Sequence, residues 1–106
     1  MRKDYGKLVR DRIPDIIAGD NRNYEAITVE VDEYRALLRA KVTEEAAEIQ
    51  GATSDELLVE IGDMFEVLDA IIETYGLDRA AIGQIQTARR EERGGFSKQL
   101  KLLWAE

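Results

Sequence analysis

Two pairs of acidic side chains are the residues of this chain best suited to chemistry. Glu45 and Glu48 form the first pair, and Glu60 and Asp63 form the second. Residues three apart share one face of a helix, so two such pairs on neighbouring helices can bring four carboxylates together. An all-oxygen site of this kind suits Mg²⁺, or Mn²⁺ as a substitute, whereas zinc, copper and iron prefer nitrogen or sulfur ligands. Because Mg²⁺ is usually completed by water and substrate phosphates, we expect cleavage of a phosphate ester or phosphoanhydride.

The composition removes other common kinds of site. The 106 residues include no cysteine and no histidine. This excludes disulfides, thiolate-bound or histidine-bound zinc, histidine-based triads and the Glu-x-x-His pairs of di-iron bundles. The formal net charge of −7 argues against a nucleic-acid partner, which would require a dense basic surface. Carboxylates, lysines, arginines and tyrosines must therefore carry any acid–base or metal chemistry.

The length and hydrophobic content predict a single folded domain over 1–106. With 44% hydrophobic and 35% charged residues, the chain is too apolar for a disordered tail. A chain this short buries a modest share of its surface, which favours a homo-oligomer. We find no signal-peptide core after the charged N-terminus and no apolar run near the roughly 20 residues of a membrane span. We therefore expect a cytoplasmic protein with no membrane partner.

Helix signals place the two acid pairs on adjacent helices. Asp32 is the predicted N-cap of a helix over 33–51. The segment 53–56 has the spacing of a capping box and opens a second helix, which runs to Tyr75. The connection between them is short, so the two helices should be antiparallel neighbours. The acids nearest the connection then lie at similar heights on the two helices.

The rest of the chain predicts shorter elements. A proline at the start and a glycine at the end indicate a short helix over 14–19. The alternating, β-branched segment 26–31 predicts a strand, which would pair with 7–10 or with a second subunit. Asp78 can cap a further helix that reaches about Arg93. The prediction is a mainly α bundle with a short N-terminal β-pair.

The helix over 33–51 carries charge where its apolar stripe should continue. The stripe begins with Tyr34, Leu37 and Leu38, and its next positions are Lys41, Glu45 and Glu48. Burying unpaired charge costs far more than leaving it in water, so either the helix protrudes beyond the core or a cation neutralises the acids. A single Glu-x-x-Glu pair is usually just a solvated helix face. Two pairs on adjacent helices favour the metal site.

The same acids match a known signature. Glu44-Glu45-x-x-Glu48 followed by Glu60-x-x-Asp63 resembles the EExxE…ExxD signature of the all-α NTP pyrophosphohydrolases, which include MazG, dimeric dUTPases and phosphoribosyl-ATP pyrophosphohydrolase. Two flanking segments, Lys7–Pro14 and Arg89–Phe96, resemble a small MazG-like or phosphoribosyl-ATP pyrophosphohydrolase-like branch whose proteins open with KLVRDKIP. The resemblance covers nearly the whole chain.

The resemblance implies an activity, a ligand set and an assembly. The activity is metal-dependent cleavage between the α and β phosphates of a nucleotide, which releases a nucleoside monophosphate and pyrophosphate. The implied metal ligands are Glu45, Glu48, Glu60 and Asp63, with Glu44 as an additional acid that supports a second ion or orients water. The implied fold is an antiparallel helical bundle of the all-α NTP pyrophosphatase type, assembled as a homodimer or homotetramer. The short spacing between the two acid pairs favours the compact type over the elongated dUTPases.

The expected chemistry also needs a base and cations. Mg²⁺ lowers the pKa of a bound water, and Glu44 or Glu45 could accept its proton. Charge that develops on the leaving pyrophosphate requires nearby cations. The candidates are the basic residues Lys41, Lys7, Arg10, Arg12, Arg89, Arg90, Arg93 and Lys98. Each one alone is more simply explained as a solvated surface charge, but as a group in an acidic protein they indicate phosphate binding.

Three other functions remain open at this point. The chain could be a non-catalytic metal- or nucleotide-binding module that regulates a partner, or a plain helical dimerisation domain. It could also be the phosphoribosyl-ATP pyrophosphohydrolase of histidine biosynthesis. Turnover of a nucleotide panel, and the effect of Mg²⁺ on the melting temperature, separate these alternatives.

Overall fold

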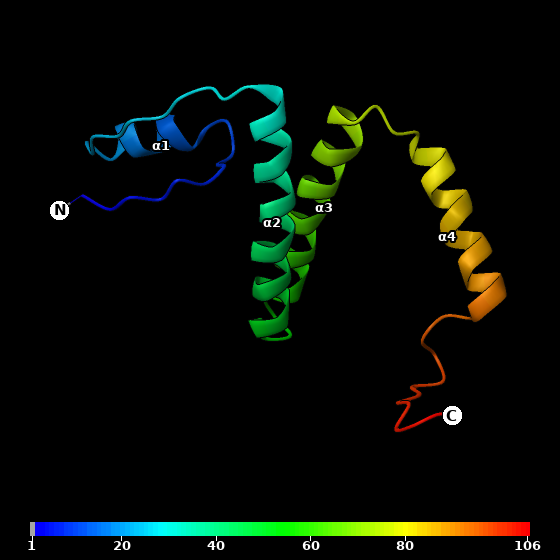
Figure 1. Ribbon diagram of the computed structural model, residues 1–106. Coiled ribbons are helices and arrows are strands. Elements are labelled where there is room, and N and C mark those ends of the chain that lie inside the picture. Colours follow the sequence, from blue (N-terminus) through cyan, green and yellow to red (C-terminus); the bar gives the residue numbers. More distant parts are fainter. Residues whose placement is uncertain (1) are drawn as a thin grey trace.

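The computed structural model describes residues 2–106 and contains four helices (Figure 1). These are α1 (Ile13–Gly19), α2 (Val31–Gly51), α3 (Leu57–Thr74) and α4 (Arg79–Arg93). The mainly α class predicted from the sequence is confirmed. Within the same residues, no helix combines the length and the apolar character that crossing a membrane requires.

Helices α2 and α3 form a hairpin, and they are the two helices that pack closely along their length (Figure 1). The turn between them is held by the Glu56 carboxylate, which accepts the backbone N–H of Thr53 at 2.8 Å. This bond is the reach-back half of the predicted capping box. The helix itself begins later than predicted, at Leu57, because the residues before it form hydrogen-bonded turns.

The start of α2 differs from the prediction. The N-cap is Glu30, in extended conformation and without a side-chain capping bond, and the helix begins at Val31. Asp32 therefore lies in the first turn of α2 rather than at its N-cap. In the first turn its negative charge still complements the helix dipole.

Helices α3 and α4 end within one residue of the predicted positions, and α4 has the predicted cap. Gly76, after α3, has a φ of 63°, a conformation that glycine adopts without steric cost. The Asp78 side chain caps α4 by accepting the backbone N–H of Ala80 at 3.0 Å. Gly94 ends α4 with a φ of 81°. Helix α4 stands apart from the hairpin (Figure 1).

The predicted N-terminal β-pair is not confirmed. Residues 22–30 form an irregular segment that leads into α2, and the structure has no strand over residues 2–106. A strand exists only when its backbone groups pair with a neighbour, and neither 7–10 nor any other described segment supplies that ladder. The β-branched pattern of 26–31 was therefore not sufficient by itself to form a strand.

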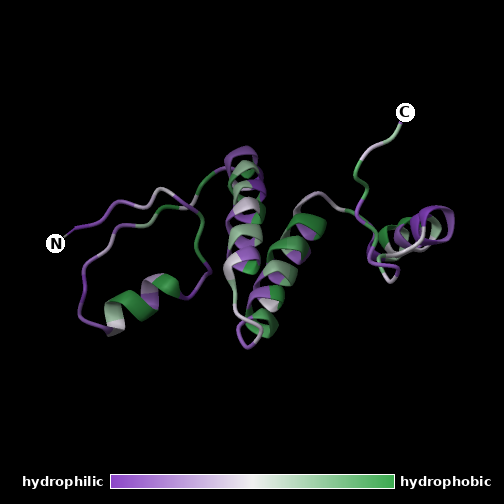
Figure 2. Ribbon diagram, turned by 90° about the horizontal axis from the view of Figure 1, so that it is seen from below, coloured by the Kyte–Doolittle hydropathy of each residue, from purple (hydrophilic) through white to green (hydrophobic). Residues whose placement is uncertain are grey.

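A single chain buries little of its apolar surface. Among the described residues, Leu38 of α2 and Val67 of α3 are the buried hydrophobic side chains. The radius of gyration is 18.3 Å, against about 13 Å for a compact domain of this length. Figure 2 shows hydrophobic residues along α3, including sides that no other helix covers. The exposed stripe of α3 consists of Leu58, Ile61, Phe65 and Leu68.

Candidate metal centre

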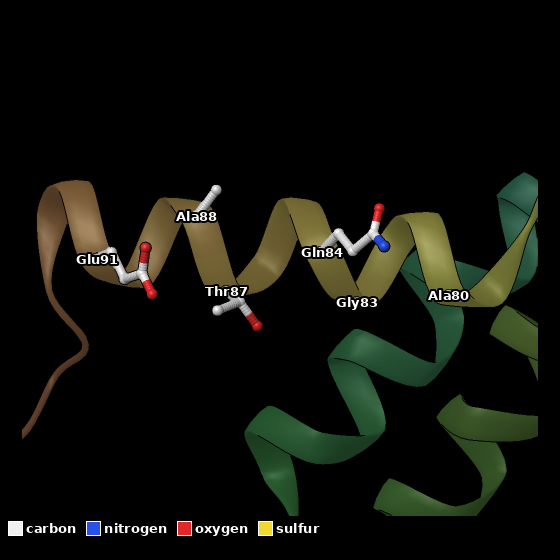
Figure 3. Close-up of a pocket in the computed structure, with 6 residues that line it drawn as sticks. All are labelled: Ala80, Gly83, Gln84, Thr87, Ala88 and Glu91. Carbon is white, nitrogen blue, oxygen red and sulfur yellow. The ribbon is translucent and has the colours of Figure 1, made fainter.

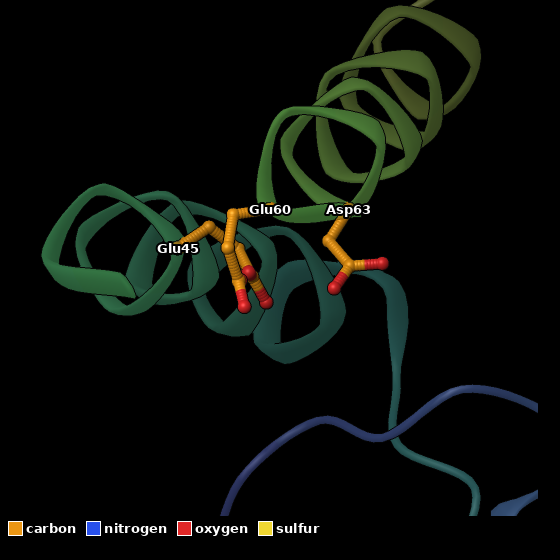
Figure 4. A group of neighbouring side chains, drawn as sticks. All are labelled: Glu45, Glu60 and Asp63. Atoms are coloured by element: carbon orange, nitrogen blue, oxygen red, sulfur yellow. The ribbon is translucent and has the colours of Figure 1, made fainter. Parts of the chain in front are cut away.

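Three of the predicted acids converge between the helices of the hairpin. Glu45 comes from α2, and Glu60 and Asp63 come from the first half of α3. One carboxylate oxygen from each side chain lies within 4.8 Å of the other two, and all three residues are half-buried. Figure 4 shows the three carboxylates gathered on the same side of the hairpin. This convergence follows from the short connection, which places the start of α3 beside the end of α2.

Glu48 lies at the margin of this group. It is exposed and is not one of the three residues whose oxygens converge among those the structure describes. It nevertheless acts on the group electrostatically. Partial desolvation, followed by repulsion from Glu48, Asp63 and Glu45, raises the pKa of Glu60 above its usual value. The four acids thus share one local field, with three at ligand spacing and the fourth beside them.

Glu44 lies next to this group and is held by two lysines. Lys7 Nζ lies 2.8 Å from Glu44 Oε1, and Lys41 Nζ lies 3.3 Å from Glu44 Oε2. The hydrogen bond from Lys7 lowers the pKa of Glu44, and the same bond raises the pKa of Lys7. A carboxylate with a lowered pKa is a weaker proton acceptor. While these pairs persist, Glu44 is therefore suited to orienting cations more than to taking a proton.

The N-terminal segment brings a second cation to the site. Arg10 Nη2 donates to Asp63 Oδ1 at 2.9 Å. In Figure 4 the blue N-terminal chain passes on the side to which the carboxylates point. Lys7 and Arg10 were predicted as phosphate ligands, and sequence reasoning did not predict that they would pair with the acids themselves. The available signal was the contrast between a basic segment and the two acid pairs in an acidic chain.

The other predicted cations do not reach these acids within one chain. Among the described residues, these five form no ion pair with the acids of the site: Arg12, Arg89, Arg90, Arg93 and Lys98. Arg12 is the N-cap of α1. The other four lie on α4 or beyond it, and α4 stands apart from the hairpin (Figure 1). Lys41 does lie at the site, with a side chain that is 17% exposed. Its ammonium pairs with Glu44 of the next helical turn.

Sequence reasoning also missed a group that closes the far end of the hairpin. Arg35 of α2 donates to the side-chain and backbone oxygens of Thr74, at the end of α3. Its guanidinium lies 4.5 Å from the centre of the Tyr75 ring. A cation at a helix C-terminus satisfies free carbonyls and complements the dipole. This contact joins the start of α2 to the end of α3, at the end of the hairpin opposite to the connection.

The pocket drawn in Figure 3 lies away from the acids of the hairpin. It is a shallow groove along one face of α4, lined by Ala80, Gly83, Gln84, Thr87, Ala88 and Glu91. These small and polar side chains bring together no set of charges comparable to the acids of the hairpin. The groove is best explained as an uncovered helix face, and the chemistry of the chain is concentrated between α2 and α3.

Comparison with known proteins assigns no family to this chain. No family model matches it, and no solved structure matches it. It is similar to an uncharacterized protein of Mycolicibacterium smegmatis, with 43% identity over 56 residues. The match covers 53% of this chain and 57% of that protein, so it spans little more than half of either one.

Proposed function

We propose that this protein is a Mg²⁺-dependent nucleotide pyrophosphohydrolase. It would cleave the α–β phosphoanhydride of a nucleoside triphosphate or related nucleotide to the monophosphate and pyrophosphate. The observation that carries this proposal is the convergence of Glu45, Glu60 and Asp63 within 4.8 Å, from two helices of one hairpin. The signature resemblance described above supplies the reaction class, and the absence of cysteine and histidine limits the choice of metal.

The residues at this site fit a hard divalent cation. Three carboxylates provide oxygen ligands only, and Mg²⁺ or Mn²⁺ commonly keeps waters in its remaining positions. Partial desolvation, followed by repulsion from the neighbouring acids, raises the pKa of Glu60, and a dication would offset both costs of ionising it. When bound, such an ion would neutralise phosphate oxygens and make a bound water more acidic. Glu48 remains the predicted fourth ligand.

The chain's own residues would hold the nucleotide around that ion. Lys7, Arg10 and Lys41 lie at the acids and can offer ammonium and guanidinium donors to phosphate oxygens. Glu44 would keep Lys7 and Lys41 positioned, and its hydrogen bond with Lys7 raises the pKa of that lysine. The proton acceptor would be Glu45 in this arrangement, since Glu44 is already paired with two cations.

We also propose that a second copy of this chain completes the bundle as a homodimer or homotetramer. The exposed stripe of α3 is apolar along several turns, and a single chain leaves it uncovered. Burying such a face against an identical face is the simplest stable outcome for a small domain. The basic residues of α4 and the tail, including Arg89, Arg93 and Lys98, would then be free to reach the acids of the partner chain.

A nucleotide panel tests the proposed reaction. The purified protein is incubated with Mg²⁺ and canonical or modified nucleoside triphosphates, with phosphoribosyl-ATP included, and pyrophosphate is measured. We expect release from at least one of them, abolished by Glu60→Gln and retained by Glu66→Gln, an exposed acid on the same helix. Absence of release from every nucleotide would refute the proposal. Mg²⁺-dependent nucleotide binding without turnover would indicate a regulatory module instead.

A further inference from the structure

We infer that Arg10 is an exchangeable counter-ion of the acid site, which holds Asp63 when no metal is bound and transfers to substrate phosphate when a divalent cation enters. This inference rests on the proposed function. It assigns Arg10 two alternative partners, the carboxylate and the phosphate, in place of a fixed phosphate contact.

The position of the N-terminal segment supports this role. Arg10 reaches Asp63 of α3 at 2.9 Å, and Lys7 reaches Glu44 of α2 at 2.8 Å. These partners are 53 and 37 residues away in the sequence, so the segment must lie across the hairpin to make both contacts. Two cations three residues apart thus span the two helices that carry the acids. The segment lies on the side of the hairpin to which the carboxylates point (Figure 4).

The same atoms that would hold a metal are those that Arg10 engages. Asp63 belongs to the three carboxylates within 4.8 Å of one another, and it is the one that carries an ion pair to the N-terminal segment. A dication beside Asp63 would compete with the guanidinium for the carboxylate and would repel it. Either cation can lower the repulsion among the acids, but the dication would displace the Arg10 guanidinium from Asp63.

The exchange is energetically accessible because the ion pair is exposed. The side chains of Arg10 and Asp63 are 58% and 39% exposed, so water and salt screen their attraction. A released guanidinium keeps its charge at any physiological pH and presents a planar set of donors suited to two phosphate oxygens. An incoming polyphosphate supplies the anion that Asp63 no longer offers. Metal entry would thereby prepare the cation that binds the substrate.

Metal binding and phosphate binding should respond to Arg10 in opposite directions. In a calorimetric titration with Mn²⁺ alone, Arg10→Gln should bind the ion about two- to fivefold more tightly than the wild type, the factor expected for loss of a surface ion pair. With Mn²⁺ saturating, the same variant should bind inorganic pyrophosphate several-fold more weakly. Arg10→Lys should fall between the two proteins in both titrations.

A matched control and the outcomes separate this inference from the function it rests on. Arg22→Gln removes an equally exposed arginine whose partner is Asp20, and it should change neither titration. Unchanged or weaker Mn²⁺ binding by Arg10→Gln, or equal tightening by Arg22→Gln, would overturn the inference alone. If the wild type bound no Mn²⁺, both the inference and the metal-dependent function would fall.

Discussion

The uncovered face of α3 makes a quantitative prediction for Phe65. Its side chain is 62% exposed in the single chain and lies at the middle of the apolar stripe. A phenylalanine presents about 200 Å², so about 120 Å² remains for a partner to cover, worth about 3 kcal/mol at about 25 cal/mol per Å². Alanine would retain part of this area, which leaves a loss of about 2 kcal/mol per copy. Two copies meet in a symmetric dimer, so Phe65→Ala should raise the dissociation constant about a thousandfold.

Sedimentation equilibrium over a range of protein concentrations measures this constant. The control is Glu66→Ala, which changes the neighbouring exposed residue and should leave the constant within a few-fold of the wild type. A wild-type protein that stays monomeric at every concentration would refute the reasoning. Equal dissociation constants for Phe65→Ala and the wild type would show that a different face is used.

Further consequences concern the acids, the core and the metal. Glu60→Gln should raise the melting temperature of the metal-free protein at neutral pH, because it removes a partly desolvated charge and its repulsion with the neighbouring acids. Asp63→Asn should gain less, because it also loses the pair with Arg10. The gain in melting temperature from Glu60→Gln should vanish as the pH falls below the usual carboxyl pKa of 4.5. A raised pKa in the folded protein costs stability only where the group is ionised in the unfolded chain. A gain that persists below this pH would contradict the assigned cause. Leu38→Ala, at a buried position of α2, should cost about 2–5 kcal/mol in urea denaturation, and a loss below 1 kcal/mol would mean that this position is not part of a packed core. Mg²⁺ at about 100 times its dissociation constant should stabilise the wild type by about 2.7 kcal/mol and Glu60→Gln by far less, as thermal denaturation with and without the ion would reveal; equal stabilisation of both would place the ion elsewhere.

The parts of this fold that sequence patterns predicted are those set by local rules. The end of α3 near Tyr75, the cap of α4 at Asp78 and the end of α4 at Arg93 depend on neighbouring residues alone, and each lies within a residue of its prediction. The acid pairs could be predicted for the same reason, because spacing of three residues fixes a shared helix face and a short connection fixes the neighbour. The convergence of Glu45 with Glu60 follows from these two facts.

What the patterns did not predict depends on distant partners. The segment 26–31 has strand character, but a strand requires a second segment, which residues 2–106 do not provide. The pairs that Lys7 and Arg10 form connect residues 37 and 53 positions apart, and no periodicity reports such contacts. The breadth of the apolar stripe on α3 did indicate more than one neighbour, and Phe65 and Leu58 remain exposed in one chain.

The proposed reaction specifies its products, and both can be measured in one experiment. Phosphorus NMR of a nucleoside triphosphate turned over with Mg²⁺ should show the monophosphate and pyrophosphate appearing in equal amounts. Both signals should be absent without the metal and with Glu60→Gln. Formation of the diphosphate and inorganic phosphate, or product formation that persists in Glu60→Gln, would contradict the proposed cleavage and the acids assigned to it.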